Sequence, residues 1–192
     1  MEQTRLEHLL IFVPCMIAVW FVVIRFLPRM LLSVYKKAIL VKGFGDGPIP
    51  FNTLYMQPES IFENPLQASG SSLSTTGVNR DTLITIGWLD LRNGPQRLHV
   101  PDMDGRYYSV QFTDPTKNTV FAYIGKRTTG TQAGDYLITG PGWKGAPPQG
   151  VEQIVLPRTS FLIIGRVLVY GESDLSAAYA LAKQIGLSPL AQ

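Results

Sequence analysis

The most prominent pattern in the chain is an uninterrupted apolar stretch near its amino end. Residues 9–24 carry no charge and would form about 24 Å of helix at a rise of about 1.5 Å per residue. The hydrocarbon core of a bilayer is roughly 30 Å thick, so flanking residues must complete a span. Arg25 can keep its aliphatic stem along lipid and its guanidinium at the interface, and apolar residues continue to Leu32. The pattern predicts one transmembrane helix within residues 9–32.

Two other interpretations fit the same stretch. A cleaved signal peptide usually has a basic first segment and a small-x-small cleavage site, whereas this chain has Arg5 beside two glutamates and no such site. A helix buried in a soluble core is the second alternative, because Pro14 and the shortness of the uncharged run weaken the transmembrane interpretation.

Basic residues follow the apolar run and bear on its orientation. They are Arg25, Arg29, Lys36, Lys37 and Lys42. Because cytoplasmic flanks of membrane spans are enriched in Lys and Arg, this distribution favours a cytoplasmic position for the rest of the chain.

The pattern then changes from helix to loop. Residues 33–42 continue the helix as an interfacial extension, and glycines and prolines at 43–50 end it. No hydrophobic period is sustained from there to residue 78. We therefore expect three parts: the membrane helix with its extension at 1–42, a linker and extended arm at 43–78, and a globular domain at 79–192.

The globular part has the pattern of β-strands separated by turns. Seven segments rich in β-branched and aromatic residues are predicted as strands: 82–91, 97–101, 106–114, 118–125, 135–140, 152–157 and 160–171. Within the third, Tyr108, Val110 and Phe112 share one face and polar residues share the other. The seventh is apolar on both faces, so we expect it to be central, with a carboxylate or carbonyl partner for Arg166. The fold class is mainly β, a single antiparallel β-sandwich.

Turn and cap residues mark the ends of several elements. Asp104 and Gly105 supply the positive φ angles of a tight hairpin turn between the second and third strands. In the tail, Ser173 is placed as the N-cap of a short amphipathic helix that ends near Gly186. The apolar stripe of this C-terminal helix consists of Leu175, Ala178, Tyr179, Ala182 and Ile185.

Composition narrows the possible functions. The 192 residues carry a formal net charge of +3, and the basic residues are scattered outside the cluster after the apolar run, so nucleic acid is not an expected partner. Cys15 is the only cysteine, which excludes an intrachain disulfide. The two histidines, His8 and His99, are too few for a multi-histidine metal site. No cofactor is expected.

A few polar groups could still carry chemistry. Asp102, Asp104 and Asp114 could bind Ca²⁺ or Mg²⁺, but Asp and Gly are also the usual residues of tight turns, and we prefer that interpretation. Trp143 and Lys144, in a loop rich in glycine and proline, could hold a ligand or a partner, although packing is the simpler role for the tryptophan.

A succession of short motifs from residue 78 to residue 166 resembles the bacterial family labelled domain of unknown function 1254. The motifs are VNRDTL, WLDLRNGP, HVPDMDGRYYSVQFTD, KRTTG, ITGPGWKG and LIIGR, in this order. The resemblance covers about residues 78–190 and implies an exported jelly-roll-like or immunoglobulin-like sandwich, but no activity. The sequence differs from the family pattern at Ile84, a position at which family members commonly have tyrosine. A second domain often associated with the family is not recognised in this sequence.

The resemblance also carries over a set of candidate site residues. They are Asn79, Asp81, Trp88, Asp90, Arg106, Tyr107, Asp114, Arg127, Trp143 and Arg166. Buried hydrogen bonds, Arg–Asp pairs and tryptophan packing would maintain the same residues in a sandwich without any ligand. We prefer this structural interpretation.

The expected function is that of a non-catalytic, single-span accessory or binding protein. We expect it in the bacterial inner membrane as a subunit of a larger complex, with a periplasmic domain as the resemblance implies. Its partners are then the lipid bilayer and another integral membrane subunit, which Arg25 would contact. The alternatives are an acidic-residue or metal-dependent hydrolase and a carbohydrate- or lipid-headgroup-binding module.

Overall fold

The computed structural model describes residues 2–43, 47–56, 81–117 and 119–190, with side chains described from residue 12 onward. The chain divides into two compact units, Met1–Ala38 and Ile39–Gln192. Asn79 lies outside the described residues, as does most of the segment expected to be an extended arm.

The first unit is formed by helix α1, Glu2–Lys42, whose last turn belongs to the second unit. Within its segment Phe12–Lys42, an 18-residue window has a mean hydropathy of 2.0, and none of that window is buried. The core helix of a soluble protein would have most of its side chains buried, which these are not. The helix is thus long and apolar enough to cross a membrane.

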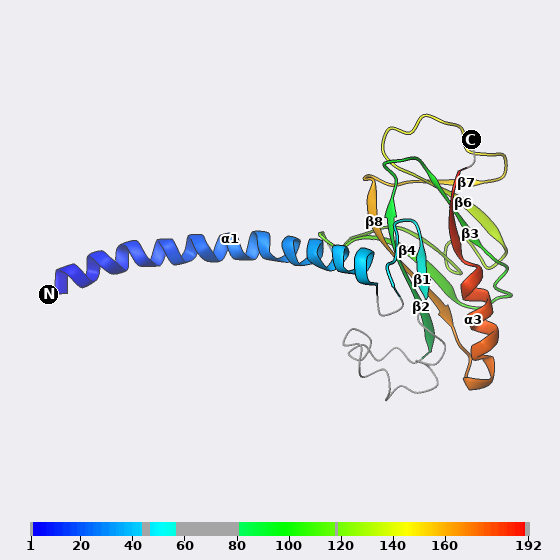
Figure 1. Ribbon diagram of the computed structural model, residues 1–192, viewed down its shortest axis with the longest axis horizontal. Coiled ribbons are helices and arrows are strands. Elements are labelled where there is room, and N and C mark those ends of the chain that lie inside the picture. The colour runs from blue at the N-terminus through cyan, green and yellow to red at the C-terminus, as the bar shows by residue number, and fades with distance from the viewer. Residues whose placement is uncertain (1, 44–46, 57–80, 118, 191–192) are drawn as a thin grey trace. The chain divides into compact units, whose positions relative to one another are not determined.

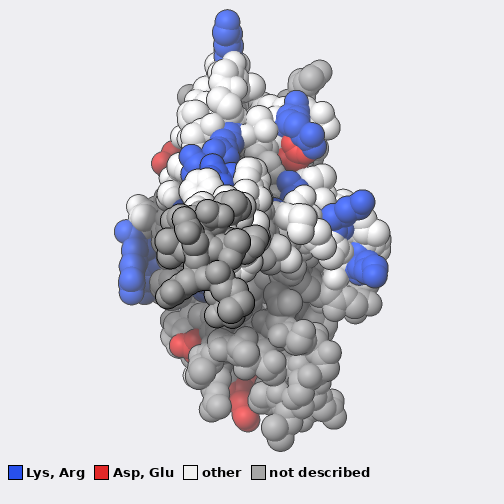
Figure 2. Space-filling view, turned by 90° about the vertical axis from the view of Figure 1, so that its left-hand side faces the viewer, with Lys and Arg blue, Asp and Glu red and all other residues white. Residues whose placement is uncertain are grey.

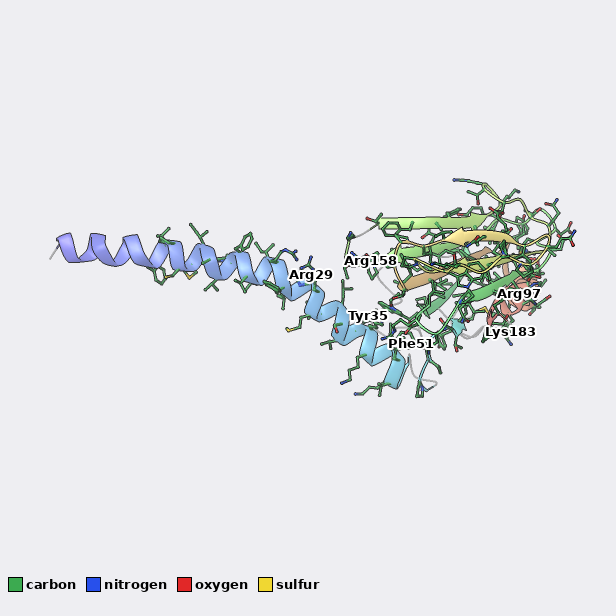
Figure 3. All side chains as sticks on the ribbon, turned by 90° about the horizontal axis from the view of Figure 1, so that it is seen from above. Arg29, Tyr35, Phe51, Arg97, Arg158 and Lys183 are labelled. Atoms are coloured by element: carbon green, nitrogen blue, oxygen red, sulfur yellow. The ribbon has the colours of Figure 1, made fainter. Side chains whose placement is uncertain are left out.

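Two prolines lie inside α1, and the helix continues through both. In Figure 3 the axis of the helix changes direction near Arg29. Pro28, the preceding residue, lacks an N–H, and its ring crowds the carbonyl of the turn before it, which explains a bend at this point. The helix ends at Gly43, whose φ of 65° and N–H bond to the Ile39 carbonyl (2.9 Å) are typical of a left-handed glycine cap.

The second unit contains two β-sheets (Figure 1). The five-stranded sheet has the order β1 (Leu54–Met56), β2 (Thr82–Asp90), β8 (Ser160–Leu168), β4 (Tyr108–Asp114), β5 (Thr119–Gly125). The four-stranded sheet has the order β7 (Glu152–Val155), β6 (Gly134–Thr139), β3 (Gln96–Val100), β9 (Gly186–Pro189). All neighbours are antiparallel except β6 and β7, which are parallel.

One hydrophobic core is shared by the two sheets. Alternate residues of β8, such as Phe161 and Ile163, are fully buried, while the residues between them are half-buried. Leu98 and Val100 of β3 enter the same core from the four-stranded sheet. Two sheets that bury one face each against a common core form a sandwich, so the predicted mainly β sandwich is confirmed. The last predicted strand, β8, is indeed central.

All seven predicted strands are present, but two elements were missed and one turn was misinterpreted. β1 and β9 are short edge strands that the hydrophobic pattern did not indicate. Asp104 and Gly105 have the expected positive φ angles of 46° and 72°. However, they connect β3 to β4, which lie in different sheets, so the turn is not a hairpin. The parallel β6–β7 pair also makes the four-stranded sheet mixed rather than purely antiparallel.

The C-terminal helix α3 spans Leu175–Gln184 and follows a 3₁₀ turn at Glu172–Asp174. Its predicted apolar stripe faces the core, with Ala178 and Ala182 buried. The expected N-cap was wrong, because Asp174 rather than Ser173 occupies that position. Gly186 does not cap the helix in a left-handed conformation either, since Ile185 is the extended C-cap residue and β9 starts at Gly186.

Candidate functional site

Two of the acidic residues considered for catalysis, Asp81 and Asp90, lie far apart. Asp81 immediately precedes β2 and is exposed, and Asp90 ends that strand. Nine residues of β-strand at about 3.3 Å each separate the two by roughly 30 Å. A single catalytic cleft therefore cannot contain both carboxylates.

Asp90 is held by neighbouring groups at the end of β2. Its carboxylate accepts hydrogen bonds from the Arg92 side chain, with Nε 3.0 Å from each oxygen, and from the Arg92 backbone N–H. Asn52 forms two bonds to the Asp90 backbone, accepting from its N–H (2.7 Å) and donating to its carbonyl (2.9 Å). Nearby, the Trp88 indole donates to Ser160 Oγ at 3.0 Å. These contacts are those of a structural corner of the sheet.

Asp114 has a different structural role in the β4–β5 hairpin. Its Oδ1 accepts the Thr116 backbone N–H at 2.9 Å and also the Thr116 hydroxyl, the pattern of an Asx turn. Its Oδ2 lies 3.2 Å from Arg158 Nη1. Asp102 similarly accepts the Asp104 N–H at 2.9 Å. Over the residues that the structure describes, no group of three or more His, Cys, Asp or Glu side chains could hold a metal ion.

The most buried ion pair joins the start of β4 to the segment before α3. Arg106 forms two hydrogen bonds to the Asp174 carboxylate, with Nη2 2.7 Å from Oδ1, and donates to the Leu168 carbonyl at 2.7 Å. Asp174 Oδ2 also accepts the Tyr170 N–H at 2.8 Å, and the Tyr170 ring lies 4.9 Å from the guanidinium. Bidentate pairing of this kind is geometrically specific. It fixes the C-terminal segment to the five-stranded sheet.

This pair changes the protonation equilibrium of both groups. Hydrogen bonding to Arg106 lowers the pKa of Asp174 from its ordinary value of 3.8 to about 2, although burial opposes the shift. The same hydrogen bond raises the pKa of Arg106. Asp174 is therefore ionised in the folded protein well below the pH at which it would be protonated in an unfolded chain.

A second polar group lies on the outer face of the five-stranded sheet, away from the core. In register, Arg166 of β8 is opposite Ser109 of β4, which is opposite Gly125 of β5. The tyrosine–arginine cluster, as we call this group, consists of Tyr107, Ser109, Gln111, Tyr123, Arg127 and Arg166. Three of the carried-over residues, Tyr107, Arg127 and Arg166, are thus brought together here.

Two tyrosines form the middle of the tyrosine–arginine cluster. Their hydroxyl oxygens are 3.0 Å apart, and the Arg127 guanidinium lies 5.7 Å from the centre of the Tyr107 ring. The pKa of Tyr107 is lowered, first by its hydrogen bond with Tyr123, then by the nearby Ser109 hydroxyl and by the charges of Arg127 and Arg166, while burial opposes this. The pKa of Tyr123 is raised, mainly by burial. The surroundings of Tyr107 thus favour negative charge.

The remaining carried-over residues do not join either group. Trp143 is half-buried in the loop after β6, and a Cβ on Gly145 would lie 2.3 Å from its ring, so this tryptophan packs against its own loop. Asp135, in the neighbouring β6 strand, pairs with His99 and Arg97. Arg97 and Arg158 lie toward opposite ends of the sandwich in Figure 3. Lys and Arg side chains form several separate groups on the face drawn in Figure 2.

Sequence reasoning missed several members of these groups. Asp174 was not predicted to pair with Arg106. Gln111 and Ser109 had been placed on the polar face of their strand, but without a partner. Tyr123 could have been found only through the β4–β5 register, which pairs it with Gln111.

Comparisons with known proteins identify the family. The chain belongs to the family described as "Protein of unknown function (DUF1254)", whose model matches residues 61–189. The crystal structure of the VPA0106 protein from Vibrio parahaemolyticus is similar, with a TM-score of 0.60 and 26% identity over 82% of this chain and 34% of that one. An uncharacterized protein from Burkholderia cenocepacia matches with a TM-score of 0.41 and 11% identity, over 71% of this chain and 34% of that one.

The chain thus spans about a third of the length of each of these solved structures. Because the second TM-score is low, only the first structure supports the fold. No protein with a curated description has a significant sequence match.

The Arg106–Asp174 pair predicts a specific loss of stability in acid. Because the pKa of Asp174 is lower in the folded state, its contribution is fully present above about pH 4 and is lost as the pH falls toward 2. We expect Asp174→Asn to lower the free energy of unfolding at pH 7 by about 2 kcal/mol. The difference from the wild type should shrink toward pH 2.

Chemical denaturation of both proteins at pH 7, 4 and 2.5 measures this effect. Asp81→Asn is the matched control, because Asp81 is exposed, and it should leave stability almost unchanged. An Asp174→Asn deficit that is the same at every pH would contradict the assignment.

Proposed function

We propose that this member of the family is a membrane-anchored accessory or binding protein that acts as a non-catalytic subunit of a larger membrane complex. The observation that carries the proposal is that the candidate catalytic carboxylates do not act on one shared site, because each has its own partner or lies alone. Asp90 is bound by Arg92 and Asp114 by its own turn and Arg158, while Asp81 is exposed at the far end of β2. A hydrolase that uses paired carboxylates needs them to converge on one substrate.

The apolar helix supports the membrane anchor. Its exposed large side chains include Phe12, Ile17, Phe21 and Ile24, each more than half exposed. Apolar surface of this extent is unfavourable in water, by about 25 cal/mol per Å², and favourable in lipid. An anchored domain is confined to two dimensions, which raises its effective concentration for a neighbouring membrane protein.

Arg25 supports a partner within the membrane. It lies inside the candidate span Phe12–Lys42, with its guanidinium 6.0 Å from the centre of the adjacent Phe26 ring. A guanidinium near hydrocarbon is favourable only if it reaches the interface or a polar group of another chain. We assign Arg25 to a contact with another integral membrane subunit.

The proposed subunit contact is tested by purification of the full chain from its native membrane in mild detergent. We expect a second membrane protein in stoichiometric amount, and its recovery should fall severalfold for Arg25→Leu because the interhelical contact is lost. Arg29→Leu, four residues further along α1, is the matched control and should retain the partner. Recovery of the wild-type protein as a clean monomer would argue against the subunit role.

We also propose that the sandwich is on the extracytoplasmic face, which in a bacterial inner membrane is the periplasm. Family resemblance supports this placement, whereas the basic residues after the span favour the opposite one. The N-terminus before the span is weakly charged, and its orientation signal can be overruled when the helix assembles with partners.

Reporter fusions after Gln192 test this orientation. A reporter that folds only outside the cytoplasm should be active, and a reporter that works only inside the cytoplasm should be silent. The reverse pattern would refute the extracytoplasmic placement and leave the anchor itself intact.

A further inference from the structure

Arg166 is the charged residue whose position is least explained by the fold. It lies half-buried on the outer face of β8, the central strand of the five-stranded sheet, and its hydrogen bond goes to the neutral amide oxygen of Gln111, at 3.2 Å. Within the described ranges, no ion pair joins a carboxylate to Arg166 or to the neighbouring Arg127. A guanidinium withdrawn from water without a counter-ion is costly, so such residues are normally paired.

Hydroxyl groups surround this unpaired charge. Tyr107 and Tyr123 share one hydrogen bond, and the fully buried Ser109 Oγ has no partner that meets hydrogen-bond geometry in the part of the chain described. A half-buried guanidinium without a carboxylate partner, next to two tyrosines that share a single hydrogen bond, indicates an acceptor that is not supplied by these residues. The acceptor required is an anionic oxygen.

Gly125 lets the Tyr123 ring and the β4 backbone pack closely beside Ser109. A Cβ at this position would lie 2.6 Å from the Tyr108 carbonyl oxygen and 3.2 Å from the Tyr123 ring, so any side chain here would displace the ring or the strand. Across the sheet, Arg166 of β8 is followed by Ser109 of β4 and then by Gly125 of β5, which has no side chain.

The other neighbours of Arg166 are apolar. Ile84 is opposite Arg166 in the β2–β8 register, and Ile164 precedes it by two residues on the same face of β8. Both isoleucines are half-buried. An anionic group bound at Arg166 would thus have aliphatic surface beside it, which suits a ligand with a hydrocarbon part.

We propose that the tyrosine–arginine cluster binds the carboxylate of an amphiphilic organic acid. The Arg166 guanidinium supplies the counter-charge, the tyrosine hydroxyls donate hydrogen bonds, and Ile84 and Ile164 contact the hydrocarbon part. The lowered pKa of Tyr107 supports the same reasoning, because the groups that would stabilise a phenolate there also stabilise an incoming carboxylate. This site does not depend on the proposed membrane partner.

The proposal is tested with the full chain in nanodiscs of zwitterionic lipid, titrated calorimetrically with hexanoate. We expect saturable binding at one site, and at least about tenfold weaker binding for Arg166→Gln, because a charge-assisted hydrogen bond is lost. Arg127→Gln changes an exposed side chain and should weaken binding severalfold without affecting folding. Arg97→Gln, on the four-stranded sheet, is the matched control and should bind hexanoate as the wild type does.

Two further measurements distinguish a carboxylate site from a structural role of Arg166 and from a phosphate site. Arg166→Gln should unfold at the same denaturant concentration as the wild type or a higher one, because it removes an unpaired charge; a clear loss of stability would show a structural role and overturn the proposal. Hexanol and monohexyl phosphate should bind more weakly than hexanoate. Tighter binding of the phosphate ester would show that the site prefers a phosphate and would overturn the carboxylate assignment. Absence of saturable hexanoate binding would refute the site, as would equal binding by Arg166→Gln and Arg127→Gln.

Discussion

The burial of two sheet faces against one shared core is the constraint on which the rest of the domain depends. β8 crosses the middle of the five-stranded sheet, and its inward residues Phe161 and Ile163 contribute to the core together with Leu98 and Val100 of β3. Because most inward positions are apolar, polar groups gather mainly at the strand ends and on the outer faces. The positions available for chemistry are thus decided by the alternation of the strands.

Most charged groups near the core are used to close the sandwich. Arg106 and Asp174 attach the C-terminal helix, Asp90 fixes the end of β2, and Asp114 shapes the β4–β5 turn. Each carboxylate has its own partner, which argues for structural roles and against a catalytic centre built from them. Arg166 is the exception among these groups, and for that reason it indicates ligand binding better than any acidic residue does.

Local elements could be predicted from the sequence, and their assembly could not. Hydrophobic alternation and β-propensity located seven strands, and the helical period located the buried stripe of α3. For the turn at Asp104 and Gly105, the positive φ angles were predicted correctly, but the hairpin was not. Local φ angles do not specify which sheet the next strand joins. The candidate site was predictable only in part for the same reason. The contacts of Arg166 with Gln111 and of Tyr107 with Tyr123 follow from the register of β4 with β5 and with β8, which is distant in sequence.

The proposed function depends most on the insertion of α1 in a bilayer, and the single cysteine offers the most direct measurement of it. Cys15 lies within the apolar stretch, and its side chain is exposed on the helix. A reagent that cannot enter the bilayer does not reach a thiol in its hydrocarbon core. In intact membranes, Cys15 should therefore resist a membrane-impermeant maleimide and become fully labelled once the membranes are dissolved in SDS. Rapid labelling in both right-side-out and inverted intact vesicles would contradict a helix that crosses the membrane.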